Sequence, residues 1–223
     1  MKGLASAPGP ARPASAVTLE GRYIRLEPLS AKQHAKALYL QLCGQGTDEL
    51  WRWMAVGPFA DEVAFTAYIR QIAAQADTVF FALVVPESGA VLGYLSLMRA
   101  DVAHGVIEIG SIMFGAAVQR TRMASEAVYL LARLVFDELG YRRLEWKCNT
   151  LNAPSRRAAL RFGFVFEGIF RQHMIVKGQN RDTAWFAMLD GGWPARRAAF
   201  EAWLAPGNFD RHGGQIKKLQ QES

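Results

Sequence analysis

Polar and apolar residues alternate over several short segments of the chain, with the period expected of strands that bury one face. Residues 22–29 alternate in this way and predict a half-exposed first strand. Longer apolar runs at 78–85, 90–99 and 106–114 predict buried strands. Because short turns such as Pro-Glu-Ser-Gly at 86–89 separate these runs, we expect the three strands to form an antiparallel meander.

Helical segments lie between the strands and carry recognisable end signals. Ser30 and Asp61 are N-cap residues for two predicted helices, and Gly140 is a C-cap residue for a third. The predicted helices cover residues 30–43, 61–76, 125–139, 152–161 and 194–204, and the later strands cover 142–149, 164–171 and 182–190. This order predicts an α/β (α+β) fold with one mixed, mostly antiparallel central sheet flanked by helices.

The composition is that of an ordinary globular protein. Of the 223 residues, 51% are hydrophobic and 21% are charged, and a chain of this length buries a sizeable core. Residues 1–17 are rich in Pro, Ala and Gly and predict a disordered N-terminal lead. Residues 18–190 are expected to form the folded domain, and residues 191–223 a C-terminal helix followed by a polar tail.

Cysteine content and hydropathy limit the compartment and the kinds of site. Cys43 and Cys148 are far apart in the sequence, and they have neither metal-ligand spacing nor the number that a disulfide framework needs. No apolar run reaches the ~18 residues required for a membrane-spanning helix. We therefore expect a cytoplasmic protein without a metal site and without a membrane partner.

The net charge of +6 and the isoelectric point near 9.5 indicate an anionic partner only weakly. Arginines at 120, 122, 142, 143, 156, 157 and 161 concentrate in the second half of the chain. This bias favours a local anion site over a generally basic surface. A nucleic-acid-binding protein stays an alternative, although the chain has no signature of the RRM, KH or helix-turn-helix kind.

The anion site is expected at residues 119–127, between the predicted strand 106–114 and the helix that follows. The first backbone N–H groups of a helix have no internal partners, and the helix dipole adds positive charge at the same end. Arg120 and Arg122 add whole charges, so a phosphate-bearing cofactor suits the position. The segment has neither the Walker pattern nor the glycines of a dinucleotide fingerprint.

The same segment resembles motif A of the GNAT acetyltransferases, [QR]-x-x-G-x-[GA]. Gln119 matches its first position and Ala124 its last, whereas Arg122 stands where the family usually has Gly. An Arg there is strained if the position needs a positive φ, but it fits an α-like turn with its side chain outward toward phosphate. The segments 149–155 and 160–168, Asn-Thr-Leu-Asn-Ala-Pro-Ser and Leu-Arg-Phe-Gly-Phe…Glu-Gly, resemble the second signature of the family.

The resemblance covers about residues 18–190 and implies a GNAT fold, acetyl-CoA as cosubstrate and acyl transfer to an amine. Within the family, the chain looks most like the branch that includes the ribosomal-protein N-terminal acetyltransferases. It also implies a bulge that parts strand 106–114 from strand 142–149. The residues expected at the cofactor are Ile112, Met113, Phe114, Val118, Gln119, Arg120, Thr121, Arg122, Met123, Ala124, Ser125, Asn152 and Ser155.

Two residues are candidates for the proton transfers of the reaction. Glu108 is the one carboxylate in an apolar strand, where burial raises its pKa toward that of a general base; it equally suits a structural pair with an arginine. Many members of the family use a Tyr as general acid, but the aligned position here is Ala159. Ser155 is the candidate that could replace this acid; alternatively, its hydroxyl only bonds the backbone in the first turn of the helix. Asn152 either contacts the pantetheine chain or is an N-cap residue. Cys148 is expected to be a buried small residue.

The acceptor is less well defined than the cofactor. Trp51, Trp53, His173 and Trp185 either line its pocket or pack in the core. At pH 7 an α-amino group of pKa ~7.8 is roughly 15% neutral, and a lysine amine far less, so we expect a protein N-terminus or a small amine. A non-catalytic acyl-CoA-binding module is the alternative from another class. The protein is expected to be a monomer or a homodimer.

Overall fold

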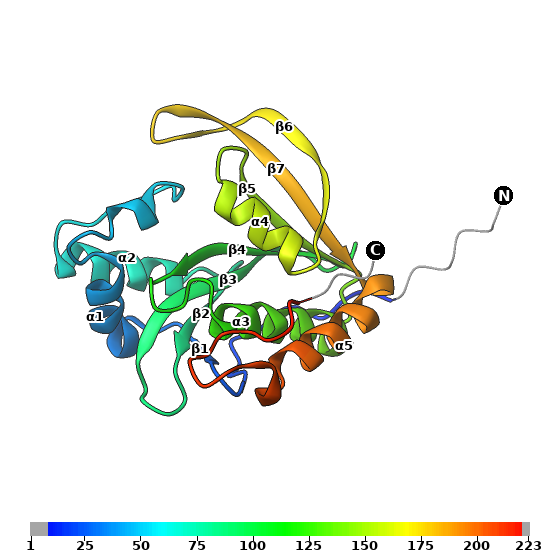
Figure 1. The fold of residues 1–223 in the computed structure, drawn as a ribbon. Coiled ribbons are helices and arrows are strands. Elements are labelled where there is room, and N and C mark those ends of the chain that lie inside the picture. Colours follow the sequence, from blue (N-terminus) through cyan, green and yellow to red (C-terminus); the bar gives the residue numbers. More distant parts are fainter. Residues whose placement is uncertain (1–8, 220–223) are drawn as a thin grey trace.

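The computed structural model describes residues 9–219, which form one seven-stranded sheet with helices on both faces (Figure 1). The strands are β1 (Arg25–Pro28), β2 (Val79–Val84), β3 (Val91–Asp101), β4 (Val106–Phe114), β5 (Arg143–Asn149), β6 (Val165–Val176) and β7 (Gln179–Leu189). Their order in the sheet is β1-β2-β3-β4-β5-β7-β6. The β4–β5 pair is parallel and the other neighbouring pairs are antiparallel. The predicted fold class is therefore confirmed.

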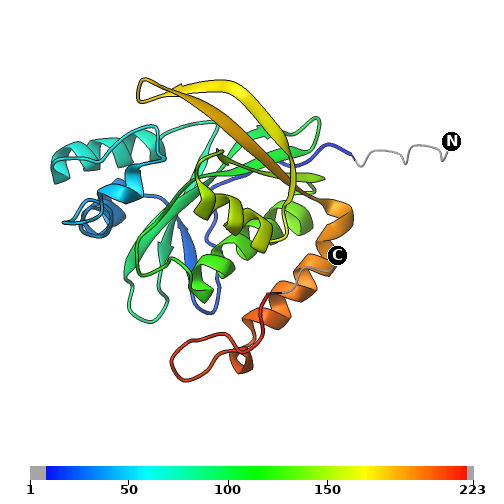
Figure 2. The same cartoon turned by 45° about the horizontal axis from the view of Figure 1, so that its top comes forward.

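Two groups of helices cover opposite faces of the sheet (Figures 1 and 2). One face carries α1 (Ala31–Leu42) and α2 (Glu62–Ala73), and the other carries α3 (Arg122–Arg133), α4 (Ala153–Arg161) and α5 (Trp193–Leu204). Short 3-10 turns, η1 (Asp48–Trp51), η3 (Asp190–Gly192) and η4 (Pro206–Asn208), and one π turn, η2 (Leu134–Glu138), complete the elements. Each face of the sheet therefore has its own buried apolar core.

The predicted N-caps of the first two helices are confirmed. The Ser30 side chain accepts a hydrogen bond from the backbone N–H of Gln33, and Asp61 accepts one from Ala64. Each bond satisfies one of the free N–H groups in the first turn. The starts of both helices are therefore set by the cap residues that the sequence indicates.

A β-bulge in β4 decides which side chains of this strand face which core. Tyr94 of β3 pairs with Met113 and Ser96 pairs with Gly110, so one residue of β3 lies opposite two residues of β4. Ser111, in the bulge, has φ of 49°. Before the bulge Ile109 packs in the α3 core, and after it Met113 packs in the α1–α2 core. The bulge thus reverses the alternation of the strand.

β4 and β5 stay paired for only four residues. Their parallel register runs from Val106 opposite Arg143 to Ile109 opposite Trp146, and it does not continue into the rest of either strand. β4 continues to Phe114 and β5 to Asn149, each paired with its antiparallel neighbour only. The two strands therefore part directly at the bulge, which leaves one edge of each without a partner strand.

Helix α3 starts earlier than predicted. Its N-cap is Thr121, so residues 122–124 belong to the first turn of the helix instead of to a preceding loop. Thr121 is of a residue type that favours N-caps, but its side chain makes no capping bond to the first turn. The expected turn before the helix is therefore limited to residues 115–121.

Glu126 on α3 holds the segment before β1. Its Oε1 accepts from the backbone N–H of Arg22 at 2.9 Å, and its Oε2 accepts from Tyr23 at 2.6 Å and Ile24 at 2.8 Å. Glu126 is only 5% exposed. Charge-assisted bonds to backbone N–H groups are among the stronger bonds in proteins, so this carboxylate fixes the N-terminal end of the sheet to α3.

The β6–β7 hairpin is longer than predicted and crosses to the α1–α2 side (Figure 1). Its strands are joined by a turn at Lys177 and Gly178 and extend well beyond the predicted bounds 164–171 and 182–190. Lys177 Nζ donates to the backbone oxygen atoms of Trp51, at 2.9 Å, and Gly57, at 2.8 Å. The prediction stopped each strand where polar residues begin, but backbone pairing within the hairpin continues through them.

The two terminal segments lie against the domain over the residues that the structure describes. The predicted lead 1–17 falls in part outside these residues; from residue 9 onward it contacts the domain, and the N–H groups of Ala11 and Arg12 donate to Val102 and Leu139. At the other end, Asn208 is buried and bonds the backbone of Trp203 and Lys217. The polar tail thus folds back onto α5.

We expect Glu126→Ala to lower the free energy of unfolding by about 2–4 kcal/mol, because three backbone N–H groups lose their acceptor. Urea denaturation followed by circular dichroism measures the change. Glu138→Ala is the matched control, since Glu138 is an exposed carboxylate and its side chain makes no bond within residues 9–219. Equal stability of the two variants would contradict the structural role of Glu126.

Candidate active site

The candidate site lies where β4 and β5 part, and it has two sides. On one side the loop 115–121 leads from β4 into α3. On the other side Glu108, Lys147 and Trp185 extend from β4, β5 and β7. The neighbours Ile107 and Ile109 pack on the α3 face, so Glu108 extends from the opposite face. The gap between the strands connects the two sides.

The start of α3 offers free backbone donors. The N–H groups of Arg122, Met123 and Ala124 have no acceptor within residues 9–219, and no side chain caps the helix. The loop before them is internally bonded: the N–H groups of Val118 and Gln119 donate to Gly115, at 2.9 and 3.3 Å. Free N–H groups and the positive end of the helix dipole are the features that favour an anion at the start of a helix.

The N–H of Val118, a predicted donor to the cofactor, is thus bonded within the loop, and its side chain is fully buried. The side chains of Gln119 and Thr121 also form hydrogen bonds to the backbone of the loop and of the strand end before it. Gln119 Nε2 donates to the Phe114 oxygen at 2.9 Å, and Thr121 Oγ1 donates to the Val118 oxygen at 2.7 Å. These side chains shape the loop, and the free donors are the N–H groups that follow it.

The positive φ of the loop belongs to Arg120, not to Arg122. Arg120 has φ of 63° and is exposed, whereas Arg122 is the first residue of α3 and does not have a positive φ. The α-like alternative for Arg122 is thus confirmed. Its side chain does not extend freely outward, however, because the guanidinium stacks 4.1 Å from the Tyr23 ring and lies 5.2 Å from the Phe209 ring.

The next residues of the predicted cofactor set face the protein core. Ala124 and Ser125 are buried, and Met123 packs partly against the same core. Ser125 Oγ accepts a hydrogen bond from Arg161 at 2.9 Å. The Ser125 hydroxyl is therefore used inside the protein, and what residues 122–124 present to an anion is their backbone.

The residues of β4 beyond the bulge border the gap. Met113 pairs with Tyr94 and Phe114 with Gly93, so this part of β4 is held by β3 on one side only. Ile112 and Phe114 pack partly against the α3 core, and Met113 is 2% exposed in the other core. Only the backbone edge that faces β5 is free of strand pairing.

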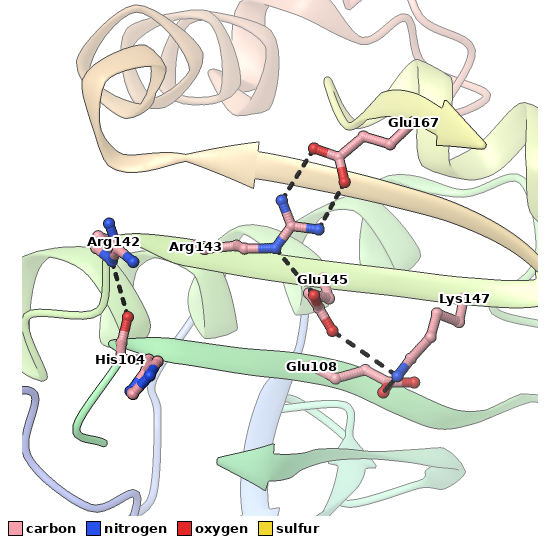
Figure 3. A network of polar contacts seen from close by, with 7 residues as sticks. All are labelled: His104, Glu108, Arg142, Arg143, Glu145, Lys147 and Glu167. Atoms are coloured by element: carbon pink, nitrogen blue, oxygen red, sulfur yellow. Dashed lines mark hydrogen bonds and ion pairs between the residues drawn. The ribbon is translucent and has the colours of Figure 1, made fainter. Parts of the chain in front are cut away.

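Glu108 sits in a network of charged side chains on the other side of the gap (Figure 3). Its Oε2 lies 2.6 Å from Lys147 Nζ, and the two side chains are 8% and 6% exposed. Lys147 also lies 3.7 Å from Glu145, which is bonded to Arg143 at 2.9 Å. Arg143 forms a bidentate pair with Glu167.

Burial raises the pKa of Glu108, and the Lys147 ammonium opposes this rise only in part. The expected alternative, a pair with an arginine, is wrong as to the partner, which is a lysine. Glu145, on the neighbouring strand, contacts both Arg143 and Lys147. The result is a carboxylate with a raised pKa at the point where the strands part.

Ser155 and Asn152 lie at the start of α4. Ser155 Oγ accepts from the indole N–H of Trp146 at 3.0 Å, so its own O–H remains a donor. This bond to Trp146 replaces the expected bond to the helix backbone. Asn152 is the N-cap residue and accepts from the Ser155 N–H at 3.1 Å. Burial raises the pKa of the Cys148 thiol, and Ala159 is fully buried.

The four aromatic candidates separate into two groups. Trp51 is fully buried and its N–H donates to the Leu42 oxygen at 2.6 Å, so it packs in the α1–α2 core. Trp53 contacts Arg52 in the same loop. Trp185 and His173 belong to the hairpin, with ring centroids 5.8 Å apart, and Lys147 Nζ lies 4.0 Å above Trp185. Only these two lie beside the Glu108 network.

Three residues of the site were not predicted from the sequence. Lys147 is one polar residue in an alternating strand, and Lys177 and Arg181 lie between the predicted strands 164–171 and 182–190. The alternation of β5 placed Lys147 on the same face as Glu145, which was a usable signal. No local signal indicated the hairpin contacts, because their partners lie more than a hundred residues away in the sequence.

The comparisons with known proteins assign the chain to a family. Residues 24–165 match the model of the acetyltransferase (GNAT) domain. The chain belongs to the GNAT acetyltransferase family. A GNAT fold and acetyl-CoA-dependent acetyl transfer follow from this membership.

Several GNAT relatives are similar over most of their length. A structure of a GCN5-related N-acetyltransferase from Brucella melitensis is 49% identical with a TM-score of 0.92, over 95% of this chain and 96% of that one. A probable GNAT acetyltransferase from Chromobacterium violaceum is 43% identical with a TM-score of 0.81, over 87% and 96%. The N-acetyltransferase p20 of Bacillus licheniformis, itself described as uncharacterized, is 29% identical over 66% of this chain and 85% of its own.

Two other kinds of feature are absent from the part of the chain that the structure describes. Residues 9–219 contain no group of three or more His, Cys, Asp or Glu side chains arranged to hold a metal ion. None of their helices has the length and apolar character needed to cross a membrane.

We expect Lys147→Gln to raise the pKa of Glu108 further, because the nearest cation is lost. The folded protein then keeps a proton that the unfolded chain loses, so the stability of the variant falls as pH rises from 5 to 8. Urea unfolding at both pH values should show about 2–5 kcal/mol more loss at pH 8 than at pH 5.

The double variant Glu108→Gln/Lys147→Gln controls for this effect, since it has no carboxyl group left to titrate. It should lose little of its stability between the two pH values. If Lys147→Gln alone is equally stable at pH 5 and 8, Glu108 does not depend on Lys147 for its charge.

Proposed function

We propose that this GNAT protein transfers an acetyl group from acetyl-CoA to a primary amine by direct attack. The observation that carries the proposal is the position of Glu108, a buried carboxylate with a raised pKa beside the gap between β4 and β5. Three kinds of group lie around this one gap: backbone N–H groups suited to an anion, a carboxylate that can accept a proton, and a hydroxyl that can donate one. In the reaction, the amine nitrogen bonds the acetyl carbon, the carbon–sulfur bond breaks, and the ammonium proton leaves the amine.

The α3 side of the gap suits the cosubstrate. The free N–H groups of Arg122, Met123 and Ala124 would hold its pyrophosphate, with charge from Arg120 and Arg122 nearby. The unpaired edge of β4, from Ile112 to Phe114, would bond the pantetheine arm. The unpaired N–H and C=O groups of this strand edge can hydrogen-bond the amide groups of the pantetheine arm, as they would those of another strand.

Glu108 is the proposed general base. A raised pKa brings a carboxyl group closer to working pH and strengthens it as a proton acceptor. Lys147 would keep it ionised while free of substrate, and Trp185 would hold the lysine through its ring face. Because the burial of Glu108 opposes its charge, taking a proton from an ammonium group is favourable at this position.

Ser155 is the proposed donor to the leaving thiolate. Trp146 donates to its oxygen, so the hydroxyl hydrogen is directed away from the indole. The position of the usual tyrosine acid is occupied by Ala159, which is fully buried and has no group that can donate a proton. Asn152 orients the start of α4 through its bond to Ser155, and its amide group remains available to the pantetheine chain.

The proposed acceptor is a protein N-terminus or a small amine. An N-terminal α-amino group or a weakly basic small amine is partly neutral near pH 7, which suits a site with one moderate base and a weak acid. The resemblance to the ribosomal-protein N-terminal branch supports the first of these, with a Glu-Ile-Gly strand at 108–110 and Glu-Gly at 167–168. We further propose that the protein works in the cytoplasm, where free cysteines such as Cys43 and Cys148 stay reduced.

The test is turnover, measured as free thiol released from acetyl-CoA over a panel of peptides and small amines. Acetylation of at least one acceptor supports the proposal. Binding of acetyl-CoA without acetylation of any acceptor would instead support a non-catalytic acyl-CoA-binding module, which the absence of a tyrosine acid at Ala159 favours.

We expect Glu108→Gln to lower kcat by about 10²–10⁴-fold, because the proton acceptor is lost. The loss should be larger at pH 7 than at pH 9.5, where more of the amine is already neutral. Steady-state kinetics at both pH values measure it. Glu167→Gln, at the far end of the same network, should keep its activity, and a Glu108→Gln variant with normal kcat would leave Glu108 a structural role.

We expect Arg122→Glu to raise the KM for acetyl-CoA about tenfold or more, and to change the KM for the amine less. A negative charge at the helix start repels phosphate and cancels the dipole. Arg133→Glu, at the other end of α3, is the control and should leave the KM for acetyl-CoA unchanged. An unchanged cofactor KM in Arg122→Glu would show that this position lies away from the phosphates.

A further inference from the structure

The face that holds Glu108 carries two arginines without carboxylate partners. Lys147 is paired with Glu108 and Glu145, so these carboxylates are engaged. Arg99 and Arg181 form neither an ion pair nor a side-chain hydrogen bond with any of residues 9–219. Both are near enough to Glu108 for the charges to interact, because Arg99 lowers the pKa of Glu108 and Glu108 raises that of Arg181.

Arg181 is the more constrained of the two. It lies on β7 and is partly buried, and its Nε is shielded from solvent and has no hydrogen-bond partner. Burial lowers the pKa of Arg181, but a guanidinium stays charged in a protein. A buried charge without a partner is costly, so it is normally paired or bound to a ligand.

The surroundings of Arg181 form part of the proposed acceptor side. His173 on the same hairpin is close enough to Arg181, Arg99 and Lys147 for all three to lower its pKa, after the larger effect of burial. Trp185, four residues further along β7, packs against Phe170 with ring centroids 4.7 Å apart. Lys177 holds the hairpin tip against the loop after α1. This side is therefore cationic, aromatic and bounded by the hairpin.

We propose that the acceptor is a small zwitterion, whose amine faces Glu108 while its anionic group, a carboxylate or a phosphate, binds Arg181. This inference rests on the proposed acetyl transfer at the same site. A planar guanidinium binds either anion with two parallel hydrogen bonds, which fixes the orientation of the ligand as well as its charge. Arg99, exposed near the opening, attracts the same anionic group. The anionic end then sets the distance of the amine from Glu108.

The experiment compares matched acceptors: amino acids, their carboxamides, and aminoalkyl phosphates of the same chain length. Each is assayed with the unmodified protein, Arg181→Gln, Arg181→Lys, and the control Arg70→Gln, an exposed arginine on α2. We expect Arg181→Gln to lower kcat/KM about 10–100-fold for amino acids or for aminoalkyl phosphates. The change for carboxamides should stay below about threefold, and Arg181→Lys should fall between.

For each acceptor, the kcat/KM of a variant is divided by that of the unmodified protein. Because both values come from the same acceptor, differences in amine pKa between acceptors do not affect the comparison. An equal loss on charged and uncharged acceptors, or full activity of Arg181→Gln on amino acids and aminoalkyl phosphates, would overturn the anion site. Efficient acetylation of a peptide with a blocked carboxyl end, unaffected by Arg181→Gln, would do the same. The relative rates on carboxylates and phosphates identify which anion the site takes.

A binding measurement separates failure of this inference from failure of the proposed function. Thermal unfolding is followed with CoA and an N-acetyl amino acid or its amide, which needs no turnover. Stabilisation by the acid that is lost in Arg181→Gln and kept in Arg70→Gln supports the anion site even if no amine is acetylated. Equal stabilisation by acid and amide, or none by the acid, overturns it.

Discussion

The short parallel ladder between β4 and β5 is the constraint on which the rest of the site depends. It ends after Ile109 and Trp146, where the bulge at Ser111 turns β4 away. A sheet with continuous pairing would have neither an open strand edge nor a path between its two faces. Gly110 belongs to this arrangement, because a Cβ there would overlap the sulfur of Met98. Backbone geometry thus creates the opening before any side chain acts.

The two sides of this opening are electrostatically different. On the α3 side, unbonded N–H groups and the helix dipole attract anions, and no acidic side chain lies in the first turn of the helix. On the other side a carboxylate and a lysine are buried together, a pair that costs desolvation and contributes little to stability by itself. A buried pair of this kind is understandable where a carboxylate must stay ionised but ready to accept a proton.

The long hairpin ties distant parts of the chain to the site. Lys177 at its tip bonds the loop after α1, and Trp185 on its second strand supports Lys147. Glu126 does the same on the opposite face, where it holds the residues before β1 against α3. Both ties use charged or polar side chains on backbone groups, so they fix position without requiring a matching side chain in the partner segment.

The sequence by itself determined the elements and the family. Hydrophobic periodicity and capping residues such as Ser30 and Asp61 act locally, so most strands and helices were predictable. The spacing of Gln119, Ala124 and the later Gly-Phe segment indicated the GNAT family, and Glu108 stood out because charge is rare in a buried strand. The conformation of Arg122 was left between two alternatives, because the choice depends on where α3 begins.

Only the tertiary structure decided which groups meet. Lys147 as the partner of Glu108, Trp146 as the donor to Ser155, and the ring of Tyr23 beneath Arg122 all join residues far apart or on different strands. Likewise, no sequence pattern distinguishes Arg181 from other arginines. Its importance follows from the folded structure, which partly buries its guanidinium without an anionic partner among the described residues. Local patterns follow from backbone geometry and solvent exposure, whereas pairing of charges depends on distances that only packing establishes.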